Sequence, residues 1–367
     1  MYNYRIVSFS LLHPSGFSAD EVFRSLVEGK TGLREIRADC LDKPVYAACF
    51  SDEQNRRLEA LCPCGDMNRF EKLLVAAGRE ALRKANLKGD EKIVLVAAST
   101  KGAIETENES TDIVASVKRA AGALLPGAPC AIVSNACISG LAALIAAKRR
   151  LATGNCDYAL VVGADTVSDF VLSGFNALLA LSKHICKPFD NDRDGINLGE
   201  GAAAILLRRT RELDPGIYLA GGAITNDANH ISGPSRTGAE LAEAIRRAAA
   251  ESGGGAFDFL SAHGTATLYN DEMESKAFAE AGFDRIPAHG LKAFLGHTLG
   301  AAGLIESVIC VKSLMENTLI PSAGYETQGT SRELRIQTKV EHREIKRIIK
   351  TMSGFGGCNA AVCFEKI

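Results

Sequence analysis

The sequence predicts an α/β protein in which layers of helices cover parallel or mixed sheets. Apolar runs without alternation recur along the chain, and such runs are typical of strands covered on both faces. They read "KIVLVAAS", "CAIVSNA", "DYALVVGAD", "AAAILL", "FDFLSAHG" and "AAVCFEKI". Helical stretches are expected between them at 68–85, 138–152, 239–251 and 301–316. The 35 glycines are concentrated where the predicted strands end.

Length and charge narrow the class of protein. A chain of 367 residues is too long to fold around one ordinary small hydrophobic core, so we expect one large domain or two that pack together. The formal net charge of −2 gives no basis for a nucleic-acid or membrane partner. No run approaches the roughly 18 apolar residues of a membrane span. The first residues lack the features of a secretory signal, so we expect a cytoplasmic protein.

The 11 cysteines are scattered singly, mostly inside apolar runs. This distribution is typical of buried free thiols and not of a disulfide framework. Cys62 and Cys64 form a close pair, but no second pair follows at the spacing of zinc ligands. We therefore expect no metal site.

Two segments share one pattern of strand, turn and Ala-rich helix: "CAIVSNACISGLAALIAAKRRL" and "AHGLKAFLGHTLGAAGLIESVICVKSL". The shared pattern predicts an internal duplication, with its boundary near 208–216. We expect a first half over residues 1–210 and a second half over residues 211–367.

Cys137 follows a predicted strand and begins a predicted helix that is apolar nearly all round. A thiol at a helix N-terminus meets the positive end of the helix dipole, which favours the thiolate. A buried helix behind it would hold a nucleophile rigidly. The alternative is a thiol that only packs in the core.

His263 ends an apolar strand and precedes Gly264. Ligands gather at the carboxyl ends of strands in open α/β sheets, so this histidine is a candidate for chemistry. Thr265 and Thr267 flank it on a polar turn, and Asp271 is placed to cap or open the next helix. The alternative is a structural histidine.

Lys292 and His297 lie five residues apart around a turn at Gly296. Lys292 and Glu306 both have apolar neighbours, and an isolated buried charge is costly unless it is paired. We therefore expect a polar network around Lys292 and Glu306. The alternative is a pair of long side chains whose charged ends reach the surface of a helix.

The segment "SGFGGCN" places Gly354, Gly356 and Gly357 around Phe355. Glycines allow backbone angles that other residues avoid, and such a loop can present N–H groups to a developing oxyanion. The alternative is a tight turn between two strands.

Taken together, the motifs resemble those of the β-ketoacyl-acyl carrier protein synthases of the elongating type, within the thiolase-like superfamily. The matching segments are "NAC", "HGTAT", "KAFLGHTLGAAG" and "GFGGCN". The segments at 187–207 ("KPFDNDRDGINLGEGAAAILL") and 225–234 ("TNDANHISGP") fit the family as well. The resemblance therefore covers most of the chain.

The resemblance implies a five-layered αβαβα fold of two similar halves, with the nucleophile in the first half and two histidines in the second. It implies decarboxylative condensation of an acyl thioester with malonyl-acyl carrier protein, without a cofactor beyond the carrier's phosphopantetheine arm. The implied partners are acyl carrier protein and a second copy of the chain, which meets the first at the strand before Cys137. A heterodimer with a related subunit is the alternative.

The resemblance also implies a role for each candidate residue. Cys137 would hold the acyl chain, and its N–H would form the oxyanion hole with that of Phe355. His263 and His297 would stabilise the malonyl enolate, and Lys292 would orient them. The residues implied in substrate binding or in support are Thr265, Thr267, Gly356, Glu306 and Asp271.

Some features depart from the family pattern. The chain is short, its opening "YRIVSFSLLHPSG" lacks the usual glycine-rich first strand and turn, and Cys358 stands where threonine is more usual. Cys358 keeps a thiolase-like reaction open. A non-catalytic chain-length subunit is a further alternative, although such subunits typically lose the nucleophile. The segment 99–110 is expected near the pocket and the dimer interface.

Overall fold

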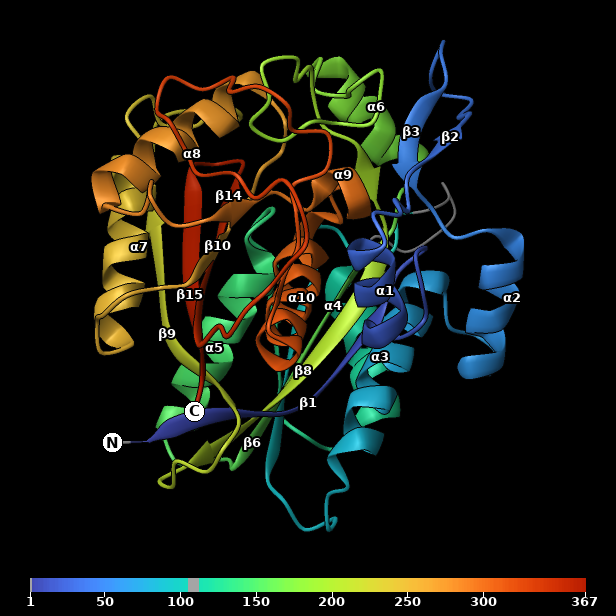
Figure 1. Ribbon diagram of the computed structural model, residues 1–367. Helices are drawn as coiled ribbons and strands as arrows, with labels where there is room; N and C mark the ends of the chain where they lie inside the picture. The colour runs from blue at the N-terminus through green and yellow to red at the C-terminus, as the bar shows by residue number, and fades with distance from the viewer. Residues whose placement is uncertain (1, 105–111) are drawn as a thin grey trace.

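The computed structural model describes residues 2–104 and 112–367 (Figure 1). Its main sheet has the order β11-β10-β14-β15-β9-β1-β8-β6-β4-β5. The first-half strands are β1 (Asn3–Leu12), β4 (Ile93–Ala98), β5 (Cys130–Val133), β6 (Tyr158–Asp165) and β8 (Gly201–Thr210). The second-half strands are β9 (Ile217–Asn226), β10 (Phe259–Ser261), β11 (Ala288–His289), β14 (Arg347–Gly354) and β15 (Cys358–Lys366).

The two sets of five strands repeat one topology. In the first, β4 pairs in parallel with β5 and β6, while β8 runs antiparallel to β6 and β1. In the second, β10 pairs in parallel with β11 and β14, while β15 runs antiparallel to β14 and β9. The sets join where Arg5 of β1 pairs with Tyr218 of β9. The exact boundary at residues 210 and 211 stays a prediction.

Helices complete five layers. One outer layer contains α3 (Arg69–Ala85) and α4 (Ile113–Leu124), which cover the first set of strands. The other contains α7 (Ala239–Glu251) and α8 (Leu268–Ala281), which cover the second set. Between the sets lie α5 (Ser139–Ala152) and α10 (Ala302–Glu316), which contact strands of both. Figure 1 shows α7 and α3 on opposite sides of these central helices.

The remaining elements surround this frame. The short helices are α1 (Ala19–Val27), α2 (Asp52–Leu61), α6 (Asp169–Ala177), α9 (Lys292–Leu295) and the 3-10 helix η1 (Leu299–Ala301). The short strands are β2 (Arg34–Ile36), β3 (Val45–Ala48), β7 (Leu198–Gly199), β12 (Thr318–Leu319) and β13 (Glu341–His342). Among the helices of the described residues, none combines the length and apolar character needed to cross a bilayer.

The predicted layered α/β fold is confirmed, and the four predicted helices each lie within one residue of an observed one. Local chemistry explains the agreement. For example, α3 begins at a capping box in which Asn68 and Glu71 bond each other's backbone N–H groups. The sequence analysis missed β9 and β14 as strands of the sheet. The opening segment, although poor in glycine, forms the long strand β1.

The two central helices approach each other at two glycines. A Cβ atom on Gly140 would lie 2.5 Å from the backbone nitrogen of Leu304, and one on Gly303 would lie 2.9 Å from that of Leu141. Real Cβ contacts essentially never fall below 3.0 Å. Glycine at these positions therefore allows the starts of α5 and α10 to meet.

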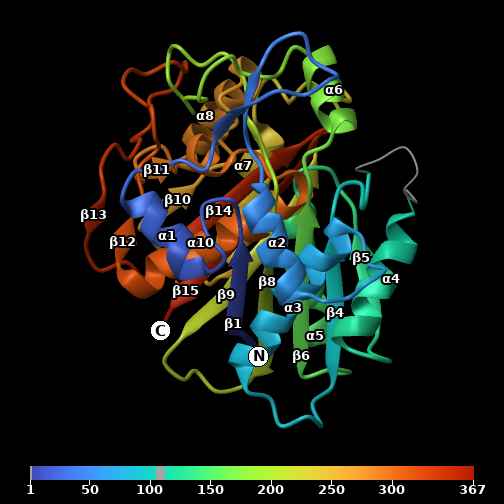
Figure 2. The same cartoon turned by 90° about the vertical axis from the view of Figure 1, so that its right-hand side faces the viewer.

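Strand β5 forms one edge of the main sheet, and within the described residues it is bonded to β4 alone (Figure 2). Cys130 is exposed, and the other three residues of the strand are partly exposed. The sequence analysis expected a second copy of the chain to meet the first at this strand. An unpaired edge is a liability unless another chain pairs with it or covers it.

We predict that Gly140→Ala lowers the free energy of unfolding by about 1–3 kcal/mol, because overpacking must push α5 and α10 apart. Gly122→Ala is the matched control, since no atom lies within 4 Å of a Cβ placed there. Alanine should stabilise α4 by about 1 kcal/mol at that position. Urea unfolding of both variants tests this. A Gly140→Ala protein as stable as Gly122→Ala would contradict the packing argument.

Candidate active site

Cys137 lies in a tight turn between β5 and α5. Ala136 just before it has φ 44°, a left-handed conformation that is uncommon for a residue with a side chain. The hydroxyl of Ser139 fixes the turn, because it donates to Ala136 O at 2.7 Å and accepts from Asn135 N at 2.8 Å. The helix begins at Ser139 with Ile138 as its N-cap residue, so Cys137 precedes the helix and does not begin it.

Cys137, His263 and His297 meet in one buried cluster. The Nε2 atom of His297 lies 3.0 Å from Cys137 Sγ. The rings of His263 and His297 are edge to face, with centroids 5.2 Å apart. Cys137 comes from the start of α5, His263 from the end of β10, and His297 from the loop between α9 and η1. The structure therefore brings together the three residues on which the predicted chemistry depends.

Burial controls the charge state of this cluster. It raises the pKa of the Cys137 thiol to about 12, and the neighbouring Cys358 adds to the effect. Lys292 and the Phe355 N–H group oppose it. Burial therefore favours the thiol of Cys137 and opposes the thiolate that a helix N-terminus was expected to favour.

Both histidines are neutral. Burial, followed by the positive charge of Lys292, lowers the pKa of His263 and of His297 well below the ordinary 6.5. A neutral imidazole can accept the proton of a thiol at 3.0 Å. The resting arrangement is thus a thiol beside a general base.

The predicted polar network around Lys292 and Glu306 is present. Both side chains are buried and form an ion pair, so the alternative of a surface helix is wrong. Lys292 Nζ also donates to His263 O at 3.0 Å. A second buried lysine, Lys350, lies 2.7 Å from the other carboxylate oxygen of Glu306. The sequence analysis missed Lys350.

Glu274 of α8 supports the turn that carries His263. Its carboxylate accepts from the backbone N–H of His263 at 2.8 Å and from that of Gly264 at 2.7 Å. Burial, followed by the charge of Asp271, raises the pKa of Glu274 to about 7. The sequence analysis also missed this residue. The sequence feature that could have identified it is an acidic residue one helical turn after Asp271, in the segment that follows "HGTAT".

Asp271 does not cap the helix, contrary to our expectation. The N-cap position of α8 is Thr267, and Asp271 lies inside the first turn. The carboxylate is buried and accepts from Phe189 N at 2.7 Å. Burial raises its pKa to about 6. Asp271 therefore joins α8 to the loop before β7.

A cavity of about 390 Å³ opens onto the cluster. Thr265 and Thr267 line it, and their hydroxyl groups are hydrogen-bonded at 2.9 Å. Exposed apolar side chains form part of its wall, including Leu178, Leu179 and Tyr269. The cavity thus joins a polar catalytic end to an apolar opening.

The loop between β14 and β15 is both a strand-to-strand turn and a wall of the cavity. The Phe355 backbone lowers the pKa of the Cys137 thiol. The Phe355 ring lines the cavity and stacks on Phe175 with centroids 5.8 Å apart. Gly356 does not line it: its N–H bonds Ile231 O at 2.7 Å. The expected role of Gly356 in substrate binding thus has no support in its position.

Cys358 is buried at the start of β15, directly after this loop, and Phe355 O lies 3.3 Å from its Sγ. It does not line the cavity. A thiolase-like reaction, in which a second cysteine acts as the base, therefore gains no support. Residues 105–110 of the segment expected near the pocket lie outside the described residues. Ser99 and Thr100, which precede them, both bond the buried carboxylate of Asp165.

Cys137, His263 and His297 are also residue types that bind metal ions, and their ligand atoms all lie within 4.8 Å of one another. A metal would require the Cys137 thiolate, which burial disfavours, and would lie near the positive charge of Lys292. The electrostatics of the cluster therefore suit neutral donors and acceptors better than a cation.

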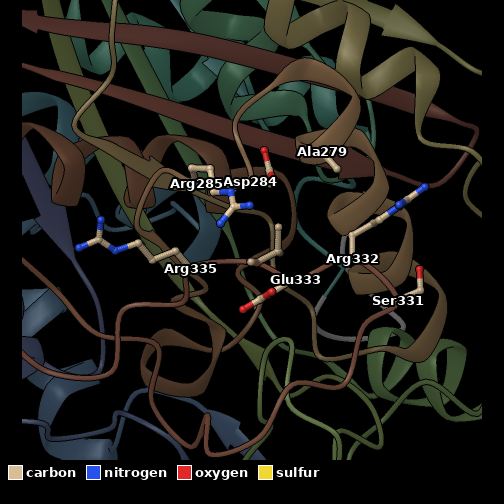
Figure 3. Close-up of a pocket in the computed structure, with 8 residues that line it drawn as sticks. Ala279, Asp284, Arg285, Ser331, Arg332, Glu333 and Arg335 are labelled. Carbon is tan, nitrogen blue, oxygen red and sulfur yellow. Dashed lines mark ion pairs between the residues drawn. The ribbon is translucent and has the colours of Figure 1, made fainter.

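A second cavity, of about 590 Å³, contains none of the predicted site residues. Its lining includes Arg285, Arg332 and Arg335. Figure 3 shows Arg332 and Arg335 pointing in opposite directions. The arginines do not converge on one point, so we assign this cavity no chemistry.

Known proteins resemble both the sequence and the structure. Among solved structures, the ishigamide ketosynthase/chain length factor has a TM-score of 0.89 at 25% identity, with 100% of this chain and 99% of that chain covered. The ketosynthase ApeO from Xenorhabdus doucetiae, in complex with its chain length factor ApeC, has a TM-score of 0.85 at 25% identity, with 100% and 98% covered. The predicted thiolase-like fold is confirmed.

Among curated relatives, a putative polyketide beta-ketoacyl synthase 1 of Streptomyces halstedii is 35% identical over 252 residues, which are 64% of this chain and 60% of that protein. Nodulation protein E of Rhizobium leguminosarum bv. trifolii is 30% identical over 335 residues, with 82% and 83% covered. The chain thus spans about 60% of the first relative's length.

Two family models match along the chain. The model of the beta-ketoacyl synthase N-terminal domain matches residues 5–212, and that of the C-terminal domain matches residues 218–326. The first covers more than half of the chain and includes Cys137, while the second includes both histidines of the cluster. The chain therefore belongs to the beta-ketoacyl synthase family.

Proposed function

We propose that the chain is a 3-oxoacyl-[acyl-carrier-protein] synthase, which condenses an acyl group held on Cys137 with a malonyl thioester on acyl carrier protein. The observation that carries this proposal is the 3.0 Å contact between Cys137 Sγ and His297 Nε2, with His263 beside them in one cavity. Both substrates arrive on phosphopantetheine arms, and the chemistry asks for no other cofactor.

In the first half-reaction, Cys137 Sγ attacks the acyl thioester carbon while His297 takes the thiol proton. The carbonyl oxygen becomes an oxyanion, and the N–H groups of Cys137 and Phe355 stabilise it in this proposal. The carbon–sulfur bond to the carrier arm then breaks. The arm leaves as a thiolate and recovers the proton from His297. The acyl group remains on Cys137.

In the second half-reaction, malonyl thioester occupies the cavity, and its thioester oxygen lies between His263 and His297. The bond to the carboxylate breaks, carbon dioxide leaves, and the electron pair becomes an enolate. Neutral histidines donate hydrogen bonds to this oxygen as the charge develops. The enolate carbon then attacks the acyl group, a carbon–carbon bond forms, and Cys137 leaves as a thiolate. The thiolate takes up one proton from water, which is the proton that the overall decarboxylative condensation consumes.

The shape of the cavity supports carrier-bound substrates. Thr265 and Thr267 offer hydroxyl groups to the amides of a pantetheine arm, while Leu179 and Tyr269 offer apolar surface near the opening. The alternative of an inert chain-length subunit has less support, because the Cys137–His297 pair and its ion-pair network are complete.

We propose a homodimer in which β5 pairs with its own copy. The partly exposed apolar edge supports this, because antiparallel pairing of two such edges would join the main sheets in an isologous interface. A heterodimer is the second candidate, because one similar solved structure is a ketosynthase with its chain length factor.

We predict that Cys137→Ala abolishes condensation, because Cys137 is the one thiol among the described residues that line the cavity. Cys137→Gln should still release carbon dioxide from malonyl-acyl carrier protein, since both histidines remain. Cys62→Ala, at a buried thiol in another part of the core, is the control and should keep full activity. Condensation by the Cys137→Ala protein would refute the assignment.

We predict that the two histidines differ. His263→Ala should slow decarboxylation about 10²–10³-fold and acylation of Cys137 much less, because it does not serve as the thiol's base. His297→Ala should slow both steps, because it contacts Cys137 Sγ. Radiolabelled acyl transfer and carbon dioxide release measure the steps separately. His289→Ala, at a buried histidine outside the cavity, should leave their ratio unchanged. Equal losses in all three variants would indicate structural roles.

We predict that light scattering gives the purified chain twice its mass of 38.9 kDa. Cys130→Lys should give a monomer, because an exposed lysine on the edge strand opposes pairing. Leu213→Lys, at an exposed loop position, should not change the mass. A chain that is monomeric and active would contradict both assemblies, and one made soluble only by a related subunit would favour the heterodimer.

A further inference from the structure

Lys350 is a fully buried cation in the middle of β14. Its ammonium group lies 2.7 Å from a carboxylate oxygen of Glu306. It also donates to Ala262 O and Thr351 O, each at 2.8 Å, and lies 3.3 Å from Ser261 O. An ammonium group has three protons to donate. Those three protons face carbonyl oxygens at the end of β10, a carbonyl oxygen of β14 and the Glu306 carboxylate of α10.

These contacts fix the backbone that carries His263. Lys350 holds the carbonyl of Ala262, and Lys292 holds the carbonyl of His263 itself at 3.0 Å. On the other side of the chain, Glu274 accepts from the N–H groups of His263 and Gly264. Buried charged side chains thus hold the peptide groups on both sides of His263.

Glu306 links the two lysines. One carboxylate oxygen pairs with Lys292, and the other pairs with Lys350. An apolar residue at position 350 would leave Ala262 O and one Glu306 oxygen without this donor, and Glu306 would be freer to turn away from Lys292. The position of Lys292, and through it that of His263, therefore depends on Lys350.

The charges of Lys292 and Lys350 also affect the pKa of His263. Two ammonium groups share one carboxylate, which leaves a net positive charge behind the cluster. After burial and the charges of Lys292 and His297, the charge of Lys350 contributes to the low pKa of His263. The charged or titratable groups around the His263 ring and its turn are Lys292, Lys350, Glu306, Glu274, His297 and Cys137.

We propose that Lys350 is a positioning residue for the decarboxylation step: through Ala262 O and Glu306, it holds His263 where the enolate forms. The proposal rests on the proposed function above. It assigns a specific task to a residue that touches neither substrate nor the reacting atoms.

Lys350→Met is the first test, because methionine is of similar length and uncharged. Carbon dioxide release should fall on the order of 10- to 100-fold, since small displacements of a catalytic group cost this much. Acylation of Cys137 should change less than about threefold, because the contact between His297 and Cys137 includes no hydrogen bond from Lys350, whose charge is the last of the causes that lower the pKa of His297. Lys350→Gln, whose amide can donate to Ala262 O, should recover part of the loss.

Lys312→Met is the matched control, because Lys312 is a buried lysine of α10 that pairs with Asp20 and Glu316 outside the cavity. It should lower the thermal stability without changing the ratio of the two steps. Equal losses in both steps for Lys350→Met, or no loss in either, would overturn the proposal.

A further measurement does not depend on enzymatic activity and therefore tests the role of Lys350 separately from the proposed function. In protein with isotope-labelled histidines, the ring signals of His263 should shift in Lys350→Met. Its pKa should rise, because one nearby positive charge is gone. If the wild-type chain releases no carbon dioxide, the proposed function fails. The His263 signals and pKa then decide by themselves whether Lys350 positions His263. Unchanged His263 signals and pKa would then overturn the role of Lys350.

Discussion

The close approach of α5 and α10 is the constraint on which the site depends. These helices come from different halves of the chain, and Gly140 and Gly303 let their starts meet without a Cβ between them. Cys137 precedes one start, and His297 lies just before η1, which leads into the other. Two rigid helices fixed against each other therefore set the distance from nucleophile to base. A cluster built on one flexible loop could not hold that distance.

Burial gives this cluster its chemistry and creates its main difficulty. In a dry site the histidines stay neutral and the thiol keeps its proton, which suits proton transfer within a pair and hydrogen bonding to an enolate. The same exclusion of water raises the free energy of any isolated buried charge. Lys292, Lys350 and Glu306 meet this cost by pairing with one another and with backbone carbonyls. The paired lysines therefore hold the backbone of the turn that carries His263.

Much of the site could be predicted because its signals are local. Cys137, His263 and the glycine loop each follow a strand, His297 follows the short helix α9, and each lies in a turn whose glycine or polar residues are adjacent in the sequence. Lys350 and Glu274 have no such signal. Lys350 lies in a strand that has apolar residues on one side of it and a polar residue on the other, and nothing in this local pattern marks it. Only the pairing of β14 with β10 places its ammonium group beside Ala262 O. Asp271 was misread for the same reason, since its partner Phe189 lies far away in the sequence.

The sequence by itself determined the α/β class and the positions of four long helices, because apolar periodicity and capping act over a few residues, and its motifs named the residues that meet in the candidate site. Only the tertiary structure decided their charge states and partners. The pKa of Cys137 follows from how completely distant segments exclude water, and not from its place before a helix. Likewise, the two lysines share Glu306 because α9, α10 and β14 converge on one point. Desolvation and pairing depend on packing in three dimensions, which no short stretch of sequence contains.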